Sequence, residues 1–121
     1  MQTPPMVQIK AFRTSPDVQK FAAGDVLFST GERGDVMYAI LDGEVDLMVG
    51  DAVVETVGPD GILGEMALID FARRSATAIA RTNGRLVRVD HERFTAMVDE
   101  HPTFALQVMR VMAARLRAAN G

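Results

Sequence analysis

Short apolar runs separated by glycine turns fill the chain from Val18 to Val89. The run EVDLMV alternates acidic and apolar residues, which is typical of a strand with one face toward water. Asp42-Gly43, Gly50-Asp51 and Asn83-Gly84 separate such runs, and these dipeptides favour the positive φ angles of tight hairpin turns. The pattern therefore predicts an antiparallel β body whose successive strands are joined by hairpins.

The hydrophobic period changes after the last of these runs. Asp90 is predicted to cap a helix over HERFTAMVDE, and FALQVMRVMAARLRAA follows His101-Pro102 as a longer helix. At helical spacing this second helix presents one apolar face, made of Ala105, Val108, Met109, Met112 and Leu116. Three arginines cluster towards its C-terminal half, which suits the helix dipole, namely Arg110, Arg115 and Arg117.

Length and composition are those of one globular domain. The chain has 121 residues, 48% of them hydrophobic, which is enough to bury a core without disulfides or metals. Residues 1–16, which contain three prolines, are predicted to be an N-terminal lead-in, and residues 17–121 the domain. Thirteen basic against sixteen acidic residues give a net charge of -3, which argues against broad electrostatic capture of nucleic acid.

The residue inventory also limits the chemistry. There is no cysteine, which excludes disulfides and thiolate chemistry and fits a reducing compartment. No signal peptide or apolar segment of membrane-spanning length is visible, so a soluble, cytoplasmic protein is expected. The two histidines, His91 and His101, both fall in the helical region, and no metal-ligand set or catalytic motif accompanies them. We expect neither an enzyme nor a cofactor.

The stretch GEMALIDFARRSATA, residues 64–78, breaks the strand alternation. GEMAL favours a single helical turn, and the free N–H groups and dipole at such a start favour an anion such as phosphate. A guanidinium shortly afterwards can donate forked hydrogen bonds to the same anion, and the small residues 75–77 allow a close approach. Glu65 would repel phosphate, and its natural partner is a hydroxyl such as that of a ribose. The stretch thus indicates a nucleotide site; the alternative is a solvated arginine pair.

Together with FAAGDVLFSTGERGDVMYAILDGEVDL upstream, this stretch resembles the phosphate-binding cassette of the cyclic nucleotide-binding domain family. The resemblance covers residues 18–117, and the family includes bacterial cAMP-receptor-type regulators, kinase regulatory subunits and nucleotide-gated channels. It implies that Arg74 pairs with the cyclic phosphate and that Glu65 binds the ribose 2′-hydroxyl. The remaining ligand-binding positions that it implies are Gly64, Met66, Ala67, Ser75 and Ala76.

Two positions depart from the family pattern. Arg73 stands where many relatives have proline, and it is expected to face solvent. Phe71 stands where relatives often have glycine, which predicts a reshaped loop after the short helix. Neither change removes a key charge.

The fold class that follows is mainly β with helices: an antiparallel, jelly-roll-like β-roll of about eight strands, a short cassette helix and two C-terminal helices. The resemblance implies a sensor of cAMP or cGMP that relays occupancy through those helices, with Arg110, Arg115 or a methionine of the last helix covering the base. A homodimer or an effector protein is the expected partner of the last helix. DNA binding in cis is not expected, because the chain stops at Gly121.

An alternative is a structural or dimerisation β-roll that no longer binds nucleotide. The presence of both Glu65 and Arg74 argues against it. A metal-dependent enzyme on a cupin-like barrel fails because its ligands are missing. The preference between cAMP and cGMP stays open at this stage.

Overall fold

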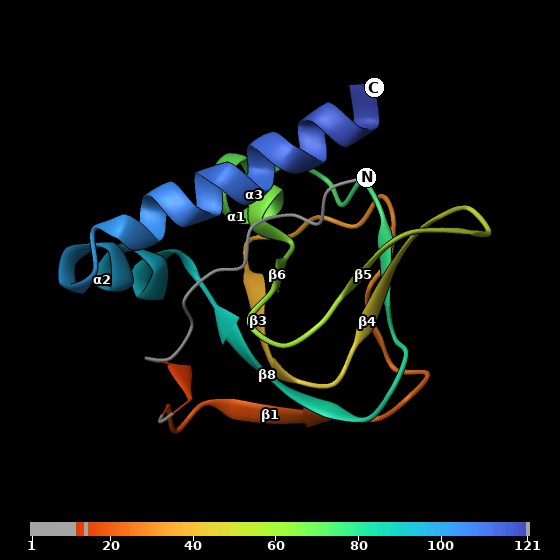
Figure 1. Cartoon of the computed structure of the whole chain (residues 1–121), viewed down its shortest axis with the longest axis horizontal. Helices are drawn as coiled ribbons and strands as arrows, with labels where there is room; N and C mark the ends of the chain where they lie inside the picture. The colour runs from red at the N-terminus through yellow and green to blue at the C-terminus, as the bar shows by residue number, and fades with distance from the viewer. Residues whose placement is uncertain (1–11, 14, 121) are drawn as a thin grey trace.

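The computed structural model describes residues 12, 13 and 15–120, which form two four-stranded antiparallel sheets and three helices (Figure 1). The first sheet contains, in spatial order, β1 (Val18–Phe21), β8 (Gly84–Val89), β3 (Met37–Asp42) and β6 (Ile62–Leu63). The second contains β2 (Val26–Phe28), β7 (Thr77–Ala80), β4 (Val45–Val49) and β5 (Ala52–Val57). The helices are α1 (Glu65–Asp70), α2 (His91–Glu100) and α3 (Thr103–Asn120). The predicted β-roll with a short helix and two C-terminal helices is confirmed.

One of the three predicted hairpin turns is a hairpin, and two are corners between the sheets. Gly50-Asp51 joins β4 to β5, which pair antiparallel. Asp42-Gly43 instead leads from the first sheet into the second, and Asn83-Gly84 leads back. The corners pack closely, because a Cβ at Gly43 would lie 2.4 Å from the carbonyl oxygen of Asn83. The prediction was wrong there because a positive-φ turn serves a corner as well as a hairpin.

Strand β3 of the first sheet is covered on both faces, and its sequence is accordingly apolar at most positions. Met37, Ala39 and Leu41 point into one core cluster, shared with α2 and α3. Tyr38 and Ile40 point the other way, into the cluster between the two sheets. This is the period-two alternation of a strand, and each fully buried aliphatic side chain contributes about 1.5–3 kcal/mol.

Helix α2 begins where the sequence predicts. The side chain of Asp90 accepts a hydrogen bond from the backbone N–H of Arg93 at 2.8 Å, as an N-cap does. No helix in the described part of the chain is both long and apolar enough to span a membrane.

Helix α3 faces the core with a different stripe from the predicted one. Phe104, Val108 and Val111 are buried, whereas Met109 is 53% and Leu116 is 46% exposed. The prediction for Met109 and Leu116 was wrong, because the buried face of α3 is turned by about one residue from the face proposed.

The lead-in is attached to the domain by its last residues. Phe12 is fully buried, with its ring centroid 5.9 Å from that of Phe104. Arg13 donates a hydrogen bond to the carbonyl oxygen of Leu41 at 3.3 Å. Residues 1–11 and 14 of the predicted lead-in lie outside the described residues.

Candidate functional site

Two residues with left-handed backbone conformations bound helix α1, which carries Glu65. Gly64, with φ of 80°, precedes the helix, and Phe71, with φ of 51°, ends it by donating its N–H to the carbonyl oxygen of Ala67 at 2.9 Å. Glycine adopts this conformation freely, whereas a residue with a Cβ is strained there. Phe71 is 62% exposed, and its ring stacks on His91 with centroids 5.5 Å apart.

Arg74 is a buried cation that contacts backbone carbonyls. Its residue surface is only 6% exposed, and its Nη1 and Nη2 atoms donate hydrogen bonds to the carbonyl oxygens of Gly64, at 3.1 Å, and Val36, at 3.0 Å. Its Cζ atom lies 4.2 Å from the ring centroid of Phe28, a cation–π contact. Among the described residues, no carboxylate forms an ion pair with it within 4.0 Å.

The electrostatic state of Arg74 follows from this burial. Burial lowers the pKa of the Arg74 guanidinium below its ordinary value, and the surrounding groups, Tyr38 first and then Asp35, offset only part of that effect. A guanidinium with desolvated N–H groups and no ion-paired carboxylate is well suited to an anionic ligand.

Two glycines make room for the Arg74 side chain. A Cβ at Gly34 would lie 2.4 Å from its Cζ atom, and a Cβ at Gly64 would lie 2.6 Å from its Nη1 atom. Gly34 belongs to the turn before β3 that the family resemblance includes, so this glycine serves the site as well as the turn.

Glu65, which is predicted to bind the sugar, is 3% exposed and is paired with Arg115 of α3. Its Oε1 atom accepts a hydrogen bond from Nη1 of Arg115, while Nη2 of Arg115 also donates to the carbonyl oxygen of Ile62 at 2.6 Å. Glu55 of β5 holds the same guanidinium in a fork, from Nε to Oε1 and from Nη2 to Oε2, both at 2.9 Å.

This cluster of Glu55, Arg115 and Glu65 contains two carboxylates and one guanidinium. Burial acts to lower the pKa of Arg115, but the two carboxylates outweigh it, so the pKa lies above its ordinary value. The arginine is firmly protonated, and it links α3 to both α1 and the second sheet.

The sequence indicated for Arg115 an interaction with the helix dipole or a contact to the base, and it indicated no role for Glu55, although both residues leave a signal in the pattern. Arg115 continues the buried stripe of α3, four residues after Val111. Glu55 shares a strand face with buried Val57, where an apolar residue is normal. A charged residue at a core-facing position of each element was the available clue.

The other predicted ligand-binding residues lie along the same two segments. Ala67 is buried, Met66 and Ala76 are half-buried, and Ser75 is exposed directly after Arg74. The structure thus brings Gly64, Glu65 and Arg74 together through the Arg74–Gly64 hydrogen bond, with the small residues following on the chain.

Arg73 differs from Arg74 in its environment. It is exposed, and its Nη1 atom donates a hydrogen bond to the carbonyl oxygen of Gly31 at 2.9 Å. It therefore ties the loop after α1 to the loop before β3, in addition to facing solvent.

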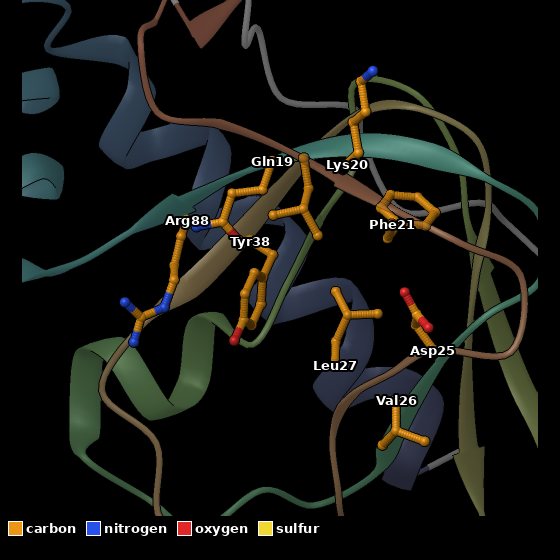
Figure 2. Close-up of a pocket in the computed structure, with 9 residues that line it drawn as sticks. Gln19, Lys20, Phe21, Asp25, Val26, Leu27, Tyr38 and Arg88 are labelled. Atoms are coloured by element: carbon orange, nitrogen blue, oxygen red, sulfur yellow. The ribbon is translucent and has the colours of Figure 1, made fainter.

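A separate cavity of about 320 Å³ opens between β1 and β2 (Figure 2). None of the predicted site residues lines it. Its wall includes Tyr38, which stacks on Phe28 at 6.0 Å between centroids. The ammonium group of Lys20 points away from the other labelled side chains in Figure 2.

In the part of the chain that the structure describes, no group of three or more His, Cys, Asp or Glu residues is placed to hold a metal ion.

The chain belongs to the cyclic nucleotide-binding domain family, whose model matches residues 18–101. It is 30% identical over 105 residues to a CRP-like cAMP-activated global transcriptional regulator of Mycobacterium tuberculosis, covering 83% of this chain and 47% of the relative. It is 38% identical over 80 residues to a cGMP-dependent protein kinase of Plasmodium berghei, covering 66% of this chain and 9% of the kinase.

A solved structure described with a cyclic-GMP-dependent signalling pathway that regulates bacterial phytopathogenesis is also similar. Its TM-score is 0.78 at 28% identity, covering 94% of this chain and 96% of that one. The fold, the family and its general regulatory character are thereby established. The chain spans about half the length of the regulator and a small part of the kinase. The activities in their names therefore describe those whole proteins and are not transferred to this chain.

Proposed function

We propose that this domain binds cAMP or cGMP, with the cyclic phosphate at Arg74 and a ribose hydroxyl at Glu65. The observation that carries the proposal is the buried Arg74 guanidinium, which contacts two backbone carbonyls and the Phe28 ring next to a buried carboxylate. A phosphate would supply the negative charge that this cation lacks, through charge-assisted hydrogen bonds. Glu65 would accept hydrogen bonds from hydroxyl groups.

The remaining predicted contacts are assigned by resemblance. Backbone groups of Gly64, Met66 and Ala67 would lie along one side of the ligand, and those of Ser75 and Ala76 along the other. The exposed Ser75 hydroxyl is available to the phosphate or the base.

The relay to the C-terminal helix would start at Glu65. A sugar hydroxyl and Arg115 would use the same carboxylate, so a bound nucleotide would change a contact that positions α3. A ligand that interacts differently with two positions of α3 shifts the population between them. We therefore propose a regulatory sensor rather than an enzyme; its cytoplasmic location stays a prediction.

The direct test is calorimetric titration of the chain with cAMP and with cGMP under matched conditions, with 5′-AMP as the non-cyclic control. We expect saturable binding of at least one cyclic nucleotide, and clearly weaker binding of 5′-AMP. Absence of saturable binding for both cyclic nucleotides would contradict the proposal. Both are tested because relatives are named for each.

We also propose that α3 pairs with a second copy of the chain. Leu106, Met109 and Leu116 are 45%, 53% and 46% exposed, and with Ala113 they repeat at intervals of three and four residues. This spacing is the seam of two packed helices. The dimerisation role accompanies nucleotide binding and does not replace it.

A further inference from the structure

The cluster of Glu55, Arg115 and Glu65 holds its arginine unequally. Glu55 accepts two parallel hydrogen bonds, from Nε and Nη2 of Arg115, both at 2.9 Å. Glu65 accepts one, from Nη1. A two-point fork between guanidinium and carboxylate is stronger and more directional than a single contact. Loss of the single contact to Glu65 would therefore leave the two-point fork to Glu55 in place.

The two carboxylates also differ in what else they can bind. The Glu65 side chain is 4% exposed, and Glu65 is the first residue of α1. The preceding residue, Gly64, accepts a hydrogen bond from Arg74 through its carbonyl oxygen. The Glu55 side chain is 20% exposed and lies on β5, outside the predicted cassette. The cluster contains two carboxylates and one guanidinium, so a ligand hydroxyl could take over Glu65 while Arg115 keeps Glu55 as its carboxylate partner.

We propose that Glu55 is a positioning residue that retains Arg115, and with it α3, when a ligand hydroxyl takes over Glu65. The inference rests on the proposed nucleotide function. It states that binding exchanges one hydrogen bond of α3 while the fork to Glu55 persists, so α3 is reoriented on the roll and is not released from it. Nothing in the family resemblance assigned a role to Glu55.

One test needs no ligand, because Glu65→Gln imitates the loss of the single ionic contact to Glu65. Hydrogen–deuterium exchange of residues 111–119 is compared in the wild type, Glu65→Gln, Glu55→Gln and the double variant, with circular dichroism as the check on folding. We expect Glu65→Gln to exchange within about twofold of the wild type, and the double variant about tenfold faster. If Glu65→Gln alone exchanges as fast as the double variant, the inference is overturned.

A second measurement uses whichever of cAMP and cGMP binds more tightly, at saturation. The wild type should keep its α3 protection, whereas Glu55→Gln with nucleotide should exchange about tenfold faster than without it. Asp51→Asn, at an exposed position just before the same strand, is the matched charge control and should behave as the wild type. Retained protection in nucleotide-bound Glu55→Gln, or lost protection in the nucleotide-bound wild type, would overturn the inference.

The outcomes separate the two proposals. Nucleotide binding with unchanged exchange in all the Glu55 variants would leave the sensor intact and reject the role of Glu55. Failure of both nucleotides to bind the wild type would reject the sensor and, with it, the exchange of Glu65 between Arg115 and a sugar.

Discussion

Arg115 of α3 donates a hydrogen bond to Glu65 of α1, so the predicted sugar-binding carboxylate already has a partner within the chain. These residues are fifty positions apart in the sequence. The contact joins the predicted ligand site to α3, the helix through which we propose that ligand occupancy is relayed. If a ligand hydroxyl binds Glu65 as proposed, ligand binding and the position of α3 are coupled, because both use the same carboxylate.

The first prediction concerns the two adjacent arginines. Arg74→Ala should weaken cyclic nucleotide binding by about 2–5 kcal/mol, because it removes the buried cation that would face the phosphate. Arg73→Ala, at an exposed position, should change the binding free energy by about 0.5 kcal/mol or less. Calorimetry measures both, with circular dichroism to verify folding. Equal affinity in the wild type and Arg74→Ala would remove the assigned role of Arg74.

The second prediction tests the position of the Arg74 side chain with a substitution that leaves its charge unchanged. Gly34→Ala would put a Cβ 2.4 Å from the guanidinium Cζ, and the flexible side chain would have to move. We expect nucleotide affinity to fall by about tenfold, while thermal stability changes little. Gly58→Ala is the control, since a Cβ there meets nothing within 4 Å. If both variants bind like the wild type, the observed position of Arg74 is not the one that binds ligand.

The third prediction concerns the stability of the ion cluster. Arg115→Met should lower the free energy of unfolding by about 3 kcal/mol, because it leaves two buried or half-buried carboxylates without their cation. Arg117→Met, at an exposed position of the same helix, should change it by about 0.5 kcal/mol or less. Urea denaturation followed by circular dichroism gives both values. A loss for Arg115→Met no larger than for Arg117→Met would show that the cluster contributes little.

Local patterns predicted the elements of this fold well, and the pairing between them less well. The N-cap at Asp90 and the short helix after Gly64 follow from residue chemistry within one turn, which sequence displays directly. Whether Asp42-Gly43 closes a hairpin or turns a corner depends on strands far away along the chain, since β3 pairs with β6 and β8. Such non-local pairing leaves no mark on the turn itself.

The candidate site divides in the same way. The family resemblance predicts Glu65 and Arg74 as ligand contacts because both lie in one contiguous segment. The partner of Glu65 comes from α3 and the second partner of Arg115 comes from β5, and only the folded chain brings them together. Arg115 of α3 and Glu55 of β5 are both charged residues at core-facing positions, and the sequence shows this. The sequence alone does not show which partner each of them contacts.

The fourth prediction tests the left-handed residue that ends α1. At Phe71, with φ of 51°, glycine should be more stable than alanine by about 1 kcal/mol, because only glycine adopts that conformation without strain. The stacking contact with His91 is lost equally in both variants. At Ala96, exposed inside α2, the order should reverse, with glycine less stable than alanine by about 1 kcal/mol. Thermal denaturation of the variants measures the differences; a lower stability for Phe71→Gly than for Phe71→Ala would contradict the strained cap.

The fifth prediction concerns the exposed seam on α3. If Leu106 and Leu116 pack against a second copy, Leu106→Glu and Leu116→Glu should each shift the chain from dimer toward monomer, because a carboxylate in a helix–helix seam would be desolvated without a partner. Ala118→Glu, at an exposed position of the same helix that faces away from the seam, is the charge-adding control and should leave the mass unchanged. Light scattering coupled to size-exclusion chromatography measures the mass over a range of concentrations. A wild-type monomer at every concentration would reject the pairing, while calorimetry of the same samples would show that nucleotide binding does not depend on it.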